Sequence, residues 1–190
     1  MIDDLHAFRL AREEFERRLA LVTSGDHDRP TPCSDWNVRA LIDHVLAGDV
    51  FAVRALAGAT LVEAIDGLLG EDLVGPDVLA DFRSGADAVA AAFAAADPDS
   101  AVHHVQGEIP VRDFIEFRTT DYAGHAWDLA VAIDEDRRLD DALVGSLLGR
   151  IEQRRDVMAD IGHFGRGPTG AHDGSEQGRL LDLIGRSPVS

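Results

Sequence analysis

Four long stretches of helical spacing constrain the fold of this chain more than any other feature of its sequence. Apolar residues recur three and four positions apart over about residues 2–22, 34–56, 76–96 and 111–133, with charged residues between them. Segments rich in Gly, Pro and Asp separate these stretches, and such residues favour turns. Helices with one apolar face are stable when they bury that face against one another. The sequence therefore predicts an all-α bundle built around four long helices.

The rest of the chain is expected to attach to this bundle. Residues 101–110 lack helical spacing and are rich in Val, Ile, Gly and Pro, so we expect an extended crossing between the third and fourth helices. A weaker helical piece is expected between residues 58 and 75, and an additional helix over about 140–161. We expect residues 1–161 to form the bundle and residues 162–190 to form a tail that docks on it.

All 18 basic residues are arginine, and the absence of lysine excludes several chemistries. Schiff-base enzymes and P-loop nucleotide-binding proteins both need a lysine amine. With 35 acidic residues the formal net charge is −17, which disfavours nucleic acids and anionic membranes as partners. No apolar run is long enough to span a bilayer, and the N-terminal residues lack the pattern of a secretory signal. We therefore expect a cytoplasmic protein with no nucleic-acid or membrane partner.

Two polar side chains interrupt the apolar face of the stretch over residues 111–133. Asp121 and His125 are four residues apart, so on a helix their side chains lie on one face and can converge on one ion. His44 lies on the expected inward face of the second helix, which Ser34 or Asp35 is expected to cap. Two histidines and one carboxylate are typical of an open metal site. The alternative is a simple Asp–His hydrogen bond beside a histidine of the core.

Two longer motifs resemble those of a known family. Residues 31–45, TPCSDWNVRALIDHV, resemble the signature T-P-C-x-x-W-x-V-R-x-L-x-x-H-V of the DinB-like, mycothiol-dependent maleylpyruvate isomerase N-terminal group. Residues 121–130, DYAGHAWDLA, resemble its second motif, [DE]-x-x-x-H-[GA]-W-D-L-A. The GRSP sequence at residues 185–188 is similar to the G-R-x-P ending of one uncharacterised branch of that family.

The resemblance implies an up-down-down-up four-helix bundle, here with an additional helix and a short C-terminal tail. It implies a divalent metal ion, zinc or nickel, held by His44, Asp121 and His125, and a low-molecular-weight thiol such as mycothiol. The chain departs from the isomerase in two respects. The isomerase commonly has Glu where this chain has Asp121, and it carries a further C-terminal domain. These departures put the isomerase reaction in doubt more than they do metal binding.

Five other residues are candidates for the surroundings of the site. Trp36 and Trp127 could line a ligand cleft, although tryptophan in packed helices is commonly a core residue. Arg39 and Asp128 could form a pair behind the metal ligands or tie helix ends together. Cys33 precedes a helix, where its pKa could be lowered, but a packing role is the alternative.

The leading functional hypothesis is a metal-dependent enzyme of the thiol transferase or thiol-dependent isomerase type. It would act on a small-molecule substrate, as a monomer or a homodimer. One alternative is a noncatalytic metal-binding or ligand-sensing bundle, and another is a metal-dependent hydrolase.

Overall fold

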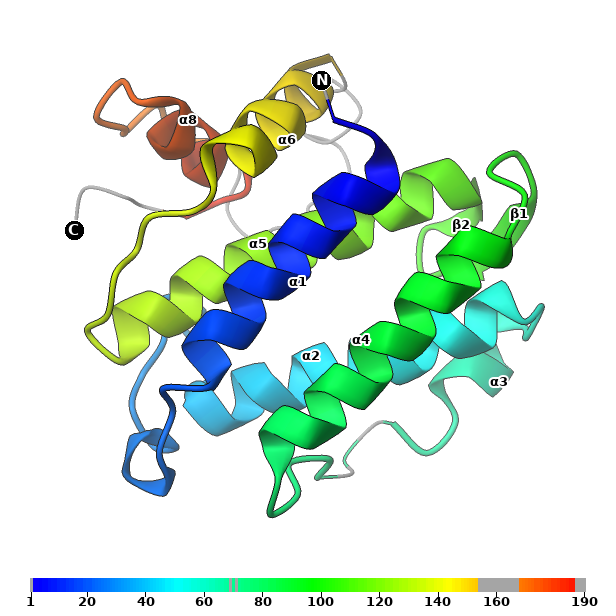
Figure 1. Cartoon of the computed structure of the whole chain (residues 1–190), viewed down its shortest axis with the longest axis horizontal. Coiled ribbons are helices and arrows are strands. Elements are labelled where there is room, and N and C mark those ends of the chain that lie inside the picture. Colours follow the sequence, from blue (N-terminus) through cyan, green and yellow to red (C-terminus); the bar gives the residue numbers. More distant parts are fainter. Residues whose placement is uncertain (1, 69, 71, 154–167, 187–190) are drawn as a thin grey trace.

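The computed structural model describes residues 2–68, 70, 72–153 and 168–186. Its centre is a bundle of four long helices (Figure 1), and the expected all-α fold is confirmed. Helices α1 and α5 run in one direction, and α2 and α4 run in the other, which gives the up-down-down-up order. Helix α1 packs against α4 and α5, and α2 also packs against these two helices. The bounds of the four are Asp4–Leu19 for α1, Val38–Leu56 for α2, Val78–Ala95 for α4 and Val111–Ala132 for α5.

The start of α2 differs from the sequence prediction. Asn37 caps the helix, and its side chain accepts a hydrogen bond from the amide of Ala40 at 2.9 Å. Ser34 and Asp35 instead lie in a turn that is closed by the Trp36 amide, which donates to the carbonyl of Cys33 at 2.9 Å. The prediction of a cap at Ser34 or Asp35 was therefore wrong, because Asn37 offers the same capping oxygen three residues before Ala40.

A short helix and a pair of short strands lie in two of the crossings between the long helices. Helix α3, Leu61–Ile65, lies between α2 and α4 and begins with a capping box. Strands β1, Ala101–His104, and β2, Gly107–Pro110, pair antiparallel between α4 and α5. Gly107 adopts a φ of 102°, which a residue with a side chain rarely adopts. The prediction of an extended crossing over residues 101–110 is confirmed, and it takes the form of a hairpin.

Helix α5 is the central helix of the molecule. Sixteen of its 22 residues are buried, on all sides of the helix. The ring of Tyr122, on α5, lies 5.3 Å from that of Phe8 and 5.7 Å from that of Phe82. A helix enclosed on all sides carries polar side chains into the interior, and each of them needs a partner there.

The C-terminal part of the described chain adds two helices, α6 (Asp141–Gln153) and α8 (Glu176–Leu183), which pack together. Leu180, Leu181 and Ile184 belong to the same hydrophobic core as the bundle. Asp182 accepts hydrogen bonds from the amides of Thr169 and Gly170. The predicted end of the helix near residue 161 and the end of the GRSP motif lie outside the described residues. The domain boundary at residue 161 stays a prediction.

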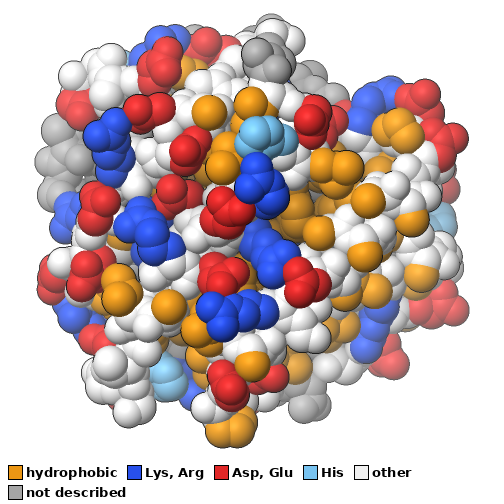
Figure 2. Space-filling model, viewed as in Figure 1, with side chains coloured by type: hydrophobic (Ala, Val, Ile, Leu, Met, Phe, Trp, Pro, Cys, Tyr) orange, Lys and Arg blue, Asp and Glu red, His pale blue; other side chains and the backbone are white. Residues whose placement is uncertain are grey.

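Charged side chains of both signs gather over the face formed by α1 and α4 (Figure 2). Arg12 of α1 pairs with Asp87 of α4, and Arg83 of α4 pairs with Glu16 of α1. Such exposed pairs contribute little to stability, so the apolar interior holds the helices together. Within the described ranges, no helix is long and apolar enough to cross a membrane.

Candidate metal centre

Helices α2 and α5 bring His44, Asp121 and His125 together. Oδ1 of Asp121 lies 3.4 Å from Nε2 of His44 and 3.3 Å from Nε2 of His125. One potential ligand atom from each of the three residues lies within 4.8 Å of the other two. Asp121 and His125 share a helical face because they are four residues apart, and His44 faces them from the neighbouring helix. The three residues therefore offer two nitrogens and one oxygen to a single point.

The cluster is closed on the α5 side and open at His44. The His125 side chain is 5 % exposed, whereas that of His44 is 40 % exposed. The ring of Trp36 lies 4.5 Å from the His44 ring and 5.6 Å from the His125 ring. Trp36 belongs to the turn before α2, and Cys33 of the same turn contacts Asp128 of α5. The cluster therefore reaches the surface at His44, beside Trp36.

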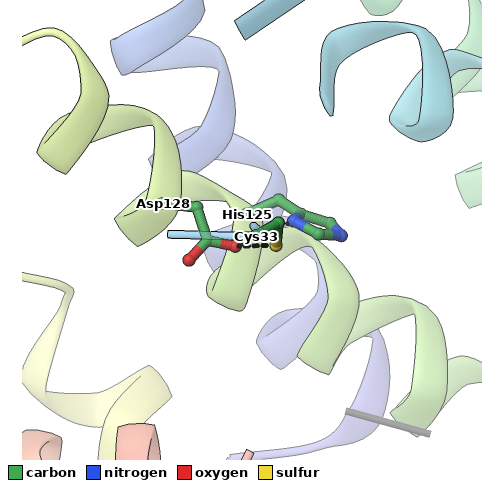
Figure 3. Close-up of side chains that lie close together, drawn as sticks. All are labelled: Cys33, His125 and Asp128. Atoms are coloured by element: carbon green, nitrogen blue, oxygen red, sulfur yellow. Dashed lines mark hydrogen bonds and ion pairs between the residues drawn. The ribbon is translucent and has the colours of Figure 1, made fainter. Parts of the chain in front are cut away.

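The other nitrogen of His125 faces a second, more deeply buried group. Its Nδ1 lies 3.0 Å from Oδ2 of Asp128, which is fully buried. Cys33 Sγ lies 3.3 Å from the same oxygen (Figure 3). Arg186, which follows α8, donates to both carboxylate oxygens of Asp128, at 2.7 and 3.2 Å. In the neutral ring, a carboxylate acceptor at Nδ1 places the single ring proton there and leaves Nε2 as an acceptor or ligand.

Cys33, His125 and Asp128 form a second grouping with metal-ligand geometry. Arg186 distinguishes it from the first, because a guanidinium already binds both oxygens of Asp128. Nη2 of Arg186 also lies 3.7 Å from Cys33 Sγ. A cation entering this group would have to displace that positive charge, so the group around His44 is the better candidate.

A buried arginine lies behind Asp121. Nη1 of Arg118 donates to Oδ2 of Asp121 at 2.6 Å, and its Nη2 donates to Oδ1 of Asp49 at 2.7 Å. Tyr122 donates its hydroxyl to Asp49, and the Arg118 guanidinium lies 4.7 Å from the centre of the Tyr122 ring. A Cβ atom at Gly48 would overlap Nη1 of Arg118, so glycine at this position leaves the space for the guanidinium.

Opposite charges shift the pKa values of the clustered groups. Burial alone raises the pKa of Asp121, but the charges of His125, His44 and Arg118 outweigh it and hold that pKa well below its ordinary value. Burial alone lowers the pKa of His125, and the carboxylates of Asp121 and Asp128 raise it well above its ordinary value. A cation binding at Nε2 would take the place of a proton that this cluster otherwise holds.

The remaining predicted residues lie in different places. Trp127 is buried in the core, whereas Trp36 covers the histidine cluster. Arg39 does not pair with Asp128: it donates to the Asp72 side chain at 2.6 Å and to the carbonyl of Val74 at 3.0 Å. Arg39 therefore ties α2 to the segment before α4.

Three residues of the site were not singled out from the sequence: Arg118, Asp49 and Arg186. Arg118 precedes Asp121 by three residues, so helical spacing could have placed the two together. Asp49 lies on α2 and is 1 % exposed, but its partner is far away in the sequence. Arg186 belongs to the GRSP motif, although nothing local indicates which side chain it meets.

Solved structures show the same fold. The structure of a mycothiol-dependent maleylpyruvate isomerase in which a histidine is mutated to alanine matches with a TM-score of 0.63 and 15% identity, covering 78% of this chain and 68% of that one. The structure of mycothiol-dependent maleylpyruvate isomerase matches with a TM-score of 0.59 and 18% identity over the same shares. Identities this low establish a common fold alone.

Sequence comparison identifies relatives and a family. Uncharacterised proteins from two strains of Mycobacterium tuberculosis are 35% identical over 169 residues, which cover 88% of this chain and 84% of theirs. The family model of the mycothiol maleylpyruvate isomerase N-terminal domain matches residues 8–130. This match includes α2 and nearly all of α5, which carry the three clustered side chains. The chain belongs to the mycothiol maleylpyruvate isomerase N-terminal domain family.

Proposed function

We propose that this chain binds a divalent metal ion through His44, Asp121 and His125, and that it is a thiol-dependent transferase or isomerase. The observation that carries the proposal is the spacing of the ligand atoms. Two ligands about 2.0–2.1 Å from a tetrahedral zinc ion lie about 3.3 Å apart. Oδ1 of Asp121 lies 3.4 and 3.3 Å from the two Nε2 atoms. Two of the three distances between ligand atoms therefore match those around a zinc ion, and all three ligand atoms lie within 4.8 Å of one another.

The surrounding groups favour this use of the cluster. Asp128 accepts at Nδ1 of His125 and thereby turns Nε2 towards Asp121. Imidazole and carboxylate ligands suit zinc, and imidazole also suits nickel. Three protein ligands leave room for one more, and the exposed edge of His44 faces solvent on that side. A catalytic site needs such an open position, whereas a structural zinc site is closed by a fourth protein ligand.

The net charge of the buried groups around the ligands also suits a divalent cation that binds a thiolate. Asp49, Arg118 and Asp121 together carry one unit of negative charge, and Asp128 is balanced by Arg186. A divalent cation and one thiolate would bring this buried group to neutrality, which limits the cost of burial.

The family and the matched structures indicate the kind of thiol. Both solved structures are of mycothiol-dependent maleylpyruvate isomerase, so we propose mycothiol as the thiol for this chain. A divalent ion with an open position acts as a Lewis acid and favours the deprotonated form of a thiol. Trp36 covers the two histidine rings and would exclude water from one side of the thiol. We propose a small electrophilic molecule as the second substrate.

Elemental analysis and calorimetry test the metal site. The purified protein, stripped with a chelator and reloaded with zinc or nickel, should hold about one ion per chain. His44→Ala should lose at least 100-fold in affinity, because the two remaining ligands cannot fix the ion. His103→Ala is the matched control, because His103 lies on the hairpin and is 44 % exposed. Equal affinities of the wild type and His44→Ala would contradict the site.

Thermal unfolding with mycothiol then tests the thiol. A thiol that binds the native state raises the melting temperature, and the rise should appear with zinc and be absent in the chelated protein. Zinc binding without any response to mycothiol would contradict the thiol-dependent enzyme and favour a noncatalytic bundle or a hydrolase.

A further inference from the structure

Arg118 places a charged side chain in the interior of the protein. Its side chain is 7 % exposed, and the side chain of its partner Asp49 is 2 % exposed. Taking such a pair out of water costs free energy that mutual attraction does not always return. Two buried atoms of the pair, Arg118 Nε and Asp49 Oδ2, have no hydrogen-bond partner among the described residues. The pair is therefore not arranged for the greatest stability. Arg118 also contacts Asp121, one of the proposed ligands.

The two carboxylate oxygens of Asp121 have different partners. Oδ2 accepts from Nη1 of Arg118 at 2.6 Å, while Oδ1 faces the Nε2 atoms of His44 and His125. A charge-assisted hydrogen bond of this length fixes the orientation of the carboxylate plane. With Oδ2 occupied, Asp121 presents one oxygen to the histidine cluster.

The guanidinium is itself held from three directions. Asp49 accepts from Nη2, the Tyr122 ring lies against the guanidinium, and Asp121 accepts from Nη1. Gly48, one turn after His44 on α2, leaves the space that Nη1 occupies. The same part of α2 therefore presents His44 to the site and makes room for Arg118.

From these contacts we infer that Arg118 is a positioning residue that restricts Asp121 to one ligand oxygen, and that Asp49 offsets the positive charge which Arg118 brings beside the cation. This inference rests on the proposed metal site and extends it. With one oxygen from Asp121 and two imidazoles, a bound ion keeps four-coordinate geometry with one open position. With both oxygens available, Asp121 would bind in a bidentate manner and raise the coordination number to five.

Cobalt(II) in place of zinc provides the test, because its visible absorption is intense when four-coordinate and weaker when five-coordinate. The double variant Arg118→Met/Asp49→Asn removes one charge of each sign and frees Oδ2. We expect the cobalt-loaded wild type to show the intense bands and the double variant to show weaker bands at equal cobalt content. The matched control is Arg12→Met/Asp87→Asn, which removes an ion pair between α1 and α4 and should keep the intense bands.

The possible results separate the inference from the proposed function. If the double variant binds cobalt with the intensity of the wild type, the role of Arg118 in restricting Asp121 is overturned while the metal site stands. If neither the wild type nor the control binds cobalt, the proposed metal site fails, and the role of Arg118 fails with it. Denaturant midpoints of the chelated proteins show separately how far each variant changes folding.

A single variant covers the case in which the double variant does not fold. Asp49→Asn keeps an oxygen that can accept from Arg118 and Tyr122, but leaves the Arg118 charge without its partner. We expect cobalt affinity to fall roughly tenfold with unchanged bands, because an uncompensated positive charge lies next to the ligand carboxylate. Unchanged affinity of folded Asp49→Asn would overturn the role assigned to Asp49. A pair that serves only the core would change the chelated protein's denaturant midpoint alone.

Discussion

The two nitrogens of the His125 ring face two different environments. On the Nε2 side lie His44 and Asp121, at 3.3 to 3.4 Å and partly exposed, which we call the ligand side. On the Nδ1 side lie Asp128, Cys33 and Arg186, which we call the support side. Asp128 is fully buried and bound by both Arg186 and His125. The support side is occupied by its own partners, and the ligand side is where we propose that the ion binds.

This difference shows how one imidazole can be held in orientation at Nδ1 and still present Nε2 for binding. The support side draws on three distant segments: the turn before α2, helix α5 and the residues after α8. The ligand side needs α2 and α5 alone. Changes on the support side should therefore act first on folding and orientation, whereas changes on the ligand side should act on binding.

The largest effect is expected from Arg186→Gln. Removing the guanidinium leaves the buried carboxylate of Asp128 with His125 as its remaining ionic partner among the described residues, so the free energy of unfolding should fall by about 3 kcal/mol. Denaturant unfolding of the chelated protein measures this. Arg179→Gln is the matched control, since Arg179 on α8 forms an exposed pair with Glu152 and should change stability little. Equal stability of the two variants would show that Asp128 does not need the guanidinium of Arg186.

A smaller effect is expected from Asp128→Asn, measured as zinc affinity. The amide keeps the size of the side chain but weakens the acceptor at Nδ1, so affinity should fall 10- to 100-fold, as is usual for such outer partners (about 2 kcal/mol). Asp87→Asn, on the exposed face of α4, is the control. Unchanged zinc affinity in folded Asp128→Asn would show that the acceptor at Nδ1 does not influence binding at Nε2.

Asp182 tests whether the support side depends on the position of α8. Its carboxylate accepts from the amides of Thr169 and Gly170. Burial alone raises the pKa of Asp182, but these hydrogen bonds outweigh burial and hold that pKa below its ordinary value. Its contribution is therefore fully present above the unfolded-state pKa of about 3.9 and is lost as pH falls through the folded-state pKa.

The measurement for Asp182 compares the wild type with Asp182→Asn at several pH values. Their difference in unfolding free energy should be about 1.5 kcal/mol at pH 7 and should shrink below about pH 4. A difference that stays constant down to pH 2 would show that the charge of Asp182 is not what matters.

The smallest effect is expected from Cys33→Ser. Cys33 lies on the support side and contacts Asp128, so zinc affinity should change less than about threefold. Calorimetry with the stripped and reloaded protein measures this. A loss of zinc comparable to that in His44→Ala would instead place the ion in the group of Cys33, His125 and Asp128, and would reverse the assignment of the two sides.

The fold was largely predictable because the signal for it is local. Helical spacing located all four long helices, and the breakers at residues 101–110 located the hairpin. The cap of α2 was placed two or three residues too early, since Ser34, Asp35 and Asn37 all have capping side chains. Residue type alone does not decide among three such residues, and one contact that holds the turn, between Cys33 and Asp128, is distant in the sequence.

The candidate site also contains residues that the sequence predicts and residues that it does not. Asp121 and His125 were identifiable because a helix places residues four apart on one face, and His44 because it lies on the inward face of its helix; the family motifs contain the same three residues. Arg118 and its partner Asp49 were missed, because their meeting depends on how α2 packs against α5. Of the two tryptophans, spacing could not tell that Trp36 covers the histidines and Trp127 fills the core.

The burial of α5 on all sides has a consequence for how the molecule opens. Local unfolding begins where few apolar contacts hold a segment, and a fully enclosed helix exchanges its amide hydrogens late. Asp121 and His125 lie on this helix, so their spacing should survive partial opening. His44 is on α2, and the turn that carries Trp36 precedes it. Partial opening would therefore dismantle the entrance to the site first and leave the carboxylate and imidazole of α5 as the last part of the site to separate.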